Sequence, residues 1–216
     1  MKKQLLFIYS ILITMNMQAQ TKTMPVTGEY YLQGVMETAS GFKLNEDSSF
    51  NFFFSYGALD REGGGSWKQE GNTIIFNSNK KQTTDFTLLQ SKKQAGNGIT
   101  IRINEPNELL KRLVHAVVKK GDAAEQASAD KNGMISFKAT AADSIILLFE
   151  WCPEKTFVFT VPDTTHNYFE FKFEPAIMEV LFSDFKLQLS DDGFEGPHPL
   201  DPVKTFHYRK ASAQDN

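Results

Sequence analysis

The residues best placed to do chemistry lie in one glycine-rich stretch, Tyr56–Ser66. Asp60, Arg61 and Glu62 stand in a row there, directly before three consecutive glycines. Glycines let a ligand approach the backbone closely, and charged side chains beside them orient its polar groups. The stretch is not a phosphate-binding loop, because no Gly-Lys-Ser/Thr sequence follows and no helical pattern begins after it. A wide hairpin connection explains the same residues, and we favour that interpretation.

A row of aromatic residues precedes this stretch. Phe50, Phe52, Phe54 and Tyr56 alternate along an extended segment, so we expect them on one side of a strand. Such rows are usually core, but they also line apolar cavities or carbohydrate platforms. Phe53 is the exception, since it points to the opposite side. The candidate ligand-binding residues are Phe50, Phe52, Phe54, Tyr56, Asp60, Arg61 and Trp67.

Metal binding has little support in the sequence. The run Asp191–Glu195 with His198 offers oxygen atoms to a cation, but a calcium loop needs more of them at defined spacing. We therefore expect a polar turn. The other histidines, His115, His166 and His207, lack metal-ligand spacing. We expect no metal and no cofactor.

Nucleophilic catalysis has no support either. Cys152 lies at the end of the apolar run Ile145–Phe149, which is typical of a buried, inert thiol. No Gly-x-Ser-x-Gly motif occurs. Carboxylates such as Asp47 and Glu62 could pair as acid and base, which keeps a hydrolase as an alternative. We predict no catalytic residue.

The first twenty residues have the pattern of a secretory signal peptide. Lys2 and Lys3 precede an apolar run, Leu5–Met15, and Ala19 offers a small residue for cleavage. We expect an exported protein, periplasmic or secreted. Without this segment, which holds two lysines and no acid, the formal charge goes from −3 to −5. This acidity argues against nucleic acid as a partner, and no second apolar stretch approaches membrane-spanning length.

Short alternating runs separated by Gly, Asn and Asp predict an all-β protein. Strands are expected about every ten residues, at 29–36, 40–45, 49–56, 65–70, 73–78, 83–90 and 98–104. This spacing is typical of a meander that closes into a barrel or sandwich. Apolar residues between Leu109 and Val118 have helical spacing, but we favour one turn near 107–111 followed by a strand from Arg112. Further strands follow, the clearest at Tyr168–Glu174.

Two stretches resemble known families. The strand at Gly28-x-Tyr30, the acidic turn Leu44–Asp47 and the Gly65-x-Trp67 hairpin resemble small lipocalin-like barrel domains of bacterial envelope proteins. True lipocalins carry Gly-x-Trp on the first strand, so ligand positions do not transfer. Residues 112–174, with Asp130-x-Asn132-Gly133 before a strand, resemble the non-catalytic transthyretin-like or carboxypeptidase-regulatory-like β-sandwich.

These observations predict a sandwich inserted into a barrel. We expect a signal peptide at 1–20, a lipocalin-like barrel at 21–104 plus 178–210, a sandwich at 105–177 and a frayed tail at 211–216. The expected function is non-catalytic binding of an apolar small molecule by an exported envelope protein. The alternatives are a module that binds an envelope protein or serves in assembly, and an envelope hydrolase with paired carboxylates.

Overall fold

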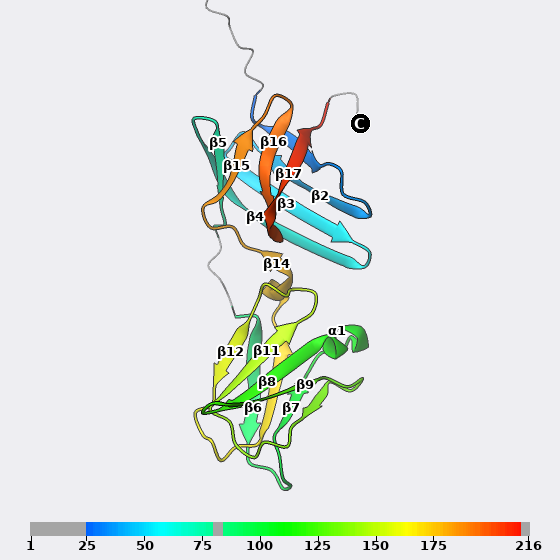
Figure 1. The fold of residues 1–216 in the computed structure, drawn as a ribbon, viewed down its shortest axis with the longest axis vertical. Coiled ribbons are helices and arrows are strands. Elements are labelled where there is room, and N and C mark those ends of the chain that lie inside the picture. The colour runs from blue at the N-terminus through cyan, green and yellow to red at the C-terminus, as the bar shows by residue number, and fades with distance from the viewer. Residues whose placement is uncertain (1–24, 80–83, 213–216) are drawn as a thin grey trace, which may run out of the picture.

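The computed structural model describes residues 25–79 and 84–212. The expected signal peptide and most of the expected frayed tail lie outside the described residues. Two all-β modules are stacked along the long axis of the molecule (Figure 1). Within the described residues, no helix is long and apolar enough to cross a membrane.

The first module is a closed antiparallel barrel, compatible with a lipocalin-like barrel. Eight of the nine strands in its sheet pair in a ring, which closes where β4 pairs with β5. The short strand β14 adds to β4 in parallel. The strands, in the order of the ring, are β4 (Leu59–Glu70), β3 (Ser49–Tyr56), β2 (Thr38–Leu44), β1 (Gly28–Leu32), β17 (Asp201–Lys210), β16 (Gly193–His198), β15 (Phe185–Leu189) and β5 (Thr73–Asn77), with β14 at Glu179–Val180.

Alternation and turn chemistry explain the barrel strands. Along β3, Phe50 and Phe52 point inward while Asn51 and Phe53 point outward, as the two-residue period of a strand requires. The β3–β4 hairpin turns at two residues, and Gly57 supplies the positive φ of +58° that such a tight turn demands. The expected wide loop at Tyr56–Ser66 is therefore wrong, because β4 already begins at Leu59.

The second module consists of two four-stranded sheets that share one core. Inward residues of both sheets, such as Ile101 and Phe169 on one and Val114 and Ile145 on the other, belong to the same buried cluster. One sheet has the order β10 (Met134–Ser136), β7 (Thr100–Ile103), β13 (Tyr168–Phe173), β6 (Phe86–Lys92), and the other β12 (Phe157–Thr160), β11 (Ser144–Phe149), β8 (Val114–Lys120), β9 (Ala123–Ser128).

The sandwich is inserted between two parts of the barrel. The chain leaves the barrel after β5 and returns through a 3₁₀ helix, Pro175–Met178, to β14. The expected boundary at residue 104 is wrong, because β6 and β7 flank β13 in the sandwich rather than joining the barrel. Their inward residues Phe86, Ile101 and Ile103 lie in the sandwich core. Alternation predicted both strands, but it carries no information on which strand pairs with which.

The segment from Asn107 to Lys120 follows the favoured alternative of one turn and then a strand. Helix α1 spans only Glu108–Arg112, and the Asn107 side chain accepts a hydrogen bond from the Leu109 amide at its start. Strand β8 then runs from Val114 to Lys120. Leu109 and Leu110 lie on this short helix, whereas the residues of β8 alternate toward the sandwich core, with Val114, Ala116 and Val118 buried.

We expect inward and outward phenylalanines of the barrel to differ strongly in their contribution to its stability. Phe182, on the returning segment, is buried and lies 5.0 Å from Phe50 and 5.4 Å from Phe52, centroid to centroid. We expect Phe182→Ala to lower the free energy of unfolding of the barrel by about 3–5 kcal/mol, because it leaves a cavity there. The outward substitution Phe53→Ala should cost less than about 1 kcal/mol.

The chain has two tryptophans, one in each module, so a Trp151→Phe background leaves Trp67 as a reporter of the barrel. Urea unfolding followed by Trp67 fluorescence measures both variants. Equal losses of stability for Phe182→Ala and Phe53→Ala would contradict this description of the core.

Candidate functional site

The expected aromatic row is divided between the core and the end of the barrel. Phe50 and Phe52 are buried inside it, Phe54 is half-buried and Tyr56 is exposed at the end of β3. Trp67 is half-buried on β4, and its Nε1 donates a hydrogen bond to the Asn45 carbonyl oxygen at 3.2 Å. The five side chains therefore do not form one ligand-binding surface.

Aromatic rings fill the centre of the barrel. The ring of Phe42 on β2 lies 5.0 Å from Phe52, 4.9 Å from Phe76 and 5.3 Å from Tyr208, so it contacts three other strands of the ring. Near β1, Tyr30 stacks on Phe194 at 3.9 Å. Burial raises the pKa of Tyr30 to about 12, as expected for a phenol inside a packed core.

Asp60, Arg61 and Glu62 lie on a strand and therefore point to alternate sides. Asp60 and Glu62 are exposed on the outer face, whereas the Arg61 side chain is only 1% exposed. Its guanidinium forms a 2.6 Å ion pair with Glu154 of the sandwich and donates to the Met178 carbonyl oxygen at 3.3 Å. Arg61 therefore joins the two modules, and a buried charge needs such partners. The expectation that it orients a ligand is wrong.

The three glycines after Glu62 let neighbouring strands, rather than a ligand, approach the backbone of β4 closely. A Cβ atom on Gly63 would lie 2.6 Å from the Val180 carbonyl oxygen and 2.7 Å from the Phe182 ring. A Cβ atom on Gly65 would lie 2.0 Å from the Asn77 carbonyl oxygen. Glycine at these positions lets β14 and the end of β5 pack against β4.

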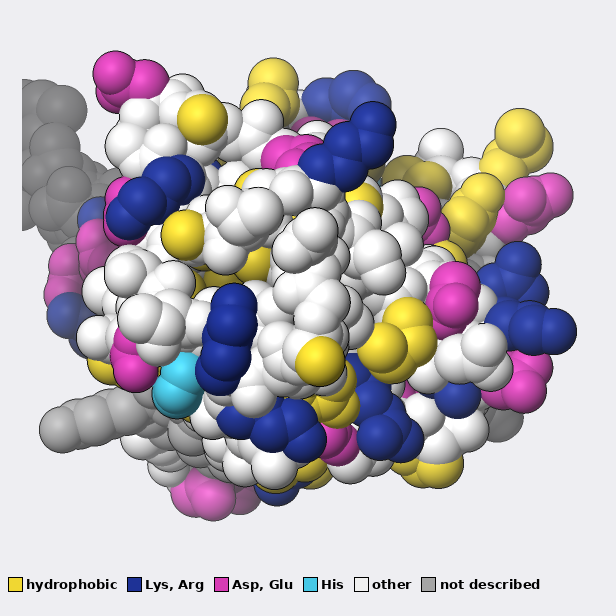
Figure 2. Space-filling view, turned by 90° about the horizontal axis from the view of Figure 1, so that it is seen from below, with side chains coloured by type: hydrophobic (Ala, Val, Ile, Leu, Met, Phe, Trp, Pro, Cys, Tyr) yellow, Lys and Arg dark blue, Asp and Glu magenta, His cyan; other side chains and the backbone are white. Residues whose placement is uncertain are grey.

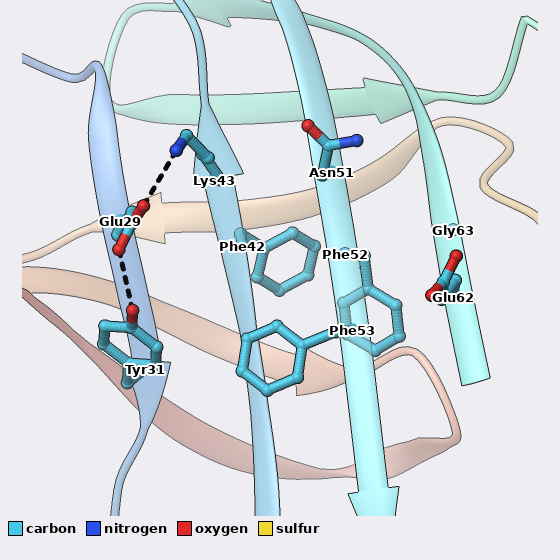
Figure 3. Close-up of a pocket in the computed structure, with 9 residues that line it drawn as sticks. All are labelled: Glu29, Tyr31, Phe42, Lys43, Asn51, Phe52, Phe53, Glu62 and Gly63. Atoms are coloured by element: carbon cyan, nitrogen blue, oxygen red, sulfur yellow. Dashed lines mark hydrogen bonds and ion pairs between the residues drawn. The ribbon is translucent and has the colours of Figure 1, made fainter. Parts of the chain in front are cut away.

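The outer face of β1–β4 carries a groove of about 410 Å³. Cross-strand pairing places Tyr31, Gly41, Phe53 and Glu62 in one row across the four strands. Because Gly41 has no side chain, the Phe53 ring lies over β2 toward Tyr31, with the ring centroids 6.2 Å apart (Figure 3). The lining residues are Glu29, Tyr31, Phe42, Lys43, Asn51, Phe52, Phe53, Glu62 and Gly63.

A polar network borders the β1 end of this groove. Glu29 accepts a hydrogen bond from the Tyr31 hydroxyl at 2.7 Å and forms a 2.9 Å ion pair with Lys43. These two hydrogen bonds, Tyr31 first, lower the pKa of Glu29, and the bond to Glu29 raises the pKa of Tyr31. The carboxylate is therefore held ionised, and the Tyr31 ring is fixed at the groove's edge.

A second hollow of about 320 Å³ continues the groove past β4. It shares Glu62 and Gly63 with the first, and it extends along Gly64 and Gly65 to β14. The two hollows therefore adjoin at Glu62 and Gly63 of β4. Together they form one surface that runs from β1 to β14.

A Ser–His pair inside the barrel has the wrong proton arrangement for catalysis. His198 Nε2 lies 3.0 Å from Ser40 Oγ, and His198 Nδ1 accepts the Leu200 amide at 3.1 Å. The proton must therefore be on Nε2, which donates to Ser40, and Ser40 in turn donates to the Phe53 carbonyl oxygen at 2.8 Å. An imidazole in this tautomer does not accept the serine proton.

A second arrangement, on the sandwich, connects a serine, a histidine and a carboxylate. His115 Nδ1 lies 2.8 Å from Ser128 Oγ, and Nε2 lies 3.0 Å from Glu150 Oε1. An acyl-transfer site also needs backbone amides aimed at a developing oxyanion. The amide that follows Ser128, that of Ala129, instead donates to the Val114 carbonyl oxygen. The connection therefore serves as a cross-strand contact on the outer face of the sheet.

The remaining residues that the sequence singled out lie in the core, on a strand or between two strands. Cys152 is buried, and desolvation raises its pKa to about 11, which leaves it as a protonated thiol at neutral pH. Asp191 and Asp192 lie in the turn between β15 and β16, whereas Gly193, Glu195 and His198 belong to β16 itself. No group of three metal-ligating side chains comes together among the described residues.

No family model, curated protein or solved structure matches the chain. The candidate site therefore rests on its geometry. Sequence alternation already singled out Phe53 as the outward aromatic residue of β3. It did not identify Tyr31 or Gly41, because their position beside Phe53 follows from strand register.

Burial of neutral His198 predicts a pH-dependent stability. Desolvation lowers the pKa of His198 from 6.5 to about 4. Between these two pKa values the unfolded chain binds a proton at His198 that the folded chain does not bind. The contribution of neutral His198 to the free energy of unfolding is therefore complete above about pH 6.5 and is lost as the pH falls toward 4. The shift corresponds to at most about 3 kcal/mol.

His198→Asn should flatten this dependence, since the Asn side chain can still accept the Leu200 amide without titrating. Urea unfolding of both proteins between about pH 7.5 and pH 4.5 measures the difference. If the substitution left the slope of the free energy of unfolding against pH unchanged, His198 would not be the group that causes the dependence.

Proposed function

We propose that this chain is an exported, non-catalytic binding protein that holds a small, partly apolar molecule in the groove on the outer face of β1–β4. One observation carries the proposal: Phe53 and Tyr31 remain 37% and 41% exposed while they border the same concave surface. Aromatic walls with a few fixed polar groups are the usual composition of a ligand site. Glu29, Lys43 and Asn51 supply those polar groups here.

The filled interior favours the outer face over the calyx that a lipocalin-like barrel implies. Phe42, Phe52 and Phe182 contact one another across the barrel centre, with centroids 5.0–6.0 Å apart. A ligand inside would have to displace these rings at the cost of their packing. The groove needs no such rearrangement, because it is already open in the protein.

Export is supported by the pattern of residues 1–20, with its two lysines, apolar run and small residue before Gln20. The two resemblances agree with this location. A lipocalin-like barrel and a transthyretin-like sandwich are both domain types that act by binding, and the barrel resemblance is to domains of envelope proteins.

A protein-binding role of the sandwich is the second candidate, and one strand edge favours it. Strand β12 is the last strand of its sheet, and its outward Val158 is 58% exposed. An open strand edge is a template for pairing with another chain. At the end of the sandwich shown in Figure 2, positive and negative side chains are interspersed. This face therefore does not favour a partner of either net charge.

The groove should bind a neutral, partly apolar dye such as Nile red. We expect Phe53→Ala to weaken binding at least about fivefold, because the ring forms the apolar wall of the site and its removal takes about 1 kcal/mol of contact or more. Fluorescence titration of the full chain measures the affinity. The matched control is Leu89→Ala, which removes a side chain that is 47% exposed on β6 of the sandwich.

Equal affinity of Phe53→Ala and the unchanged protein would contradict an outer-face site. Loss of binding with Leu89→Ala instead would direct attention to the sandwich.

A further inference from the structure

Glu62 is the unpaired charge of the groove. It is exposed on β4, and no side chain in residues 25–79 and 84–212 forms an ion pair or hydrogen bond with it. At the opposite end, Glu29 is already neutralised by Lys43 at 2.9 Å. Among the residues that the structure describes, the groove therefore has one carboxylate without an ion-pair partner, and it lies at the β4 end.

Aromatic rings lie between the two ends. Phe53 is directly opposite Glu62 in the β3–β4 register, and its ring lies over β2. Figure 3 shows this ring between Glu62 on one side and Glu29 with Tyr31 on the other. Ring faces carry negative partial charge and attract ammonium groups. A carboxylate without a partner in a groove that also exposes aromatic rings therefore favours a cation and disfavours an anion.

We propose that the groove selects an organic cation, an ammonium group on a small apolar body. The ammonium lies at Glu62, and the apolar body lies against Phe53 and Tyr31. This inference rests on the proposed outer-face site and adds the charge of its ligand.

The second hollow gives the cation room to extend. It begins at Glu62 and Gly63 and continues along the glycines of β4, and its other lining residues among those described are Ser78, Asn79 and 179–181. Substituents on the nitrogen can therefore extend past Glu62 toward β14. We therefore expect the groove to admit a substituted amine as well as a primary one.

Three probes with nearly the same body separate charge from apolar contact: phenethylamine, 2-phenylethanol and 3-phenylpropionate. Each is titrated into the ¹⁵N-labelled full chain, and dissociation constants are taken from amide shifts. We expect phenethylamine to bind about fivefold more tightly than 2-phenylethanol and 3-phenylpropionate to bind most weakly. A partly exposed ion pair supported by a ring has about this strength.

Glu62→Gln removes the charge and keeps the shape. We expect this variant to bind phenethylamine about fivefold more weakly and 2-phenylethanol unchanged, and the amine should lose its dependence on salt. The matched control is Asp122→Asn, which makes the same charge change in the exposed β8–β9 turn. Its phenethylamine affinity should stay that of the unchanged protein.

The outcomes separate this inference from the proposed function. If the alcohol and the amine bind equally and Phe53→Ala weakens both, the site stands and the charge selectivity is wrong. If Glu62→Gln leaves the amine affinity unchanged, the ammonium does not lie at Glu62 and the inference is overturned. If none of the three probes shifts any amide, both the inference and the proposed site fail.

Discussion

Ring packing across the barrel is the interaction on which the rest of the structure depends. The rings of Phe42, Phe76 and Tyr208 meet at centroid distances of 4.9 and 5.3 Å, and they come from strands on both sides of the inserted sandwich. Neither β1–β5 nor β15–β17 can bury its aromatic face alone. The barrel therefore forms only when the chain returns after the sandwich. The ion pair between buried Arg61 and the more exposed Glu154 joins the two modules there.

The same packing is the reason that we place the proposed ligand site on the outside. Because the interior is filled, the open surface of the barrel is the place where further aromatic contact is available. Part of that surface depends on Gly41 of β2, which lies in the same outer row as Tyr31 and Phe53. A Cβ atom on Gly41 would lie 2.3 Å from the Tyr30 carbonyl oxygen, so glycine lets the strands pack and leaves room for the Phe53 ring.

Part of this could be predicted from the sequence. Alternation identified the strands, the inward side of Phe50 and Phe52 and the outward Phe53. The expectation of a sandwich inserted into a barrel came from the two family resemblances. It failed where pairing decides the outcome. The placement of β6 and β7 in the sandwich, the burial of Arg61 against Glu154, and the meeting of Tyr31 with Phe53 depend on contacts between distant segments. A period of two residues describes a strand's faces but not its neighbours.

The most direct test of an outside site on a filled barrel is amide chemical-shift mapping during a phenethylamine titration. The account predicts shifts at Tyr31, Gly41 and Phe53, with Leu187 and Phe194 on the opposite wall unchanged. Shifts concentrated at Leu187 and Phe194, with the outer residues of β1–β4 unmoved, would show that the ligand enters the barrel and would contradict the account.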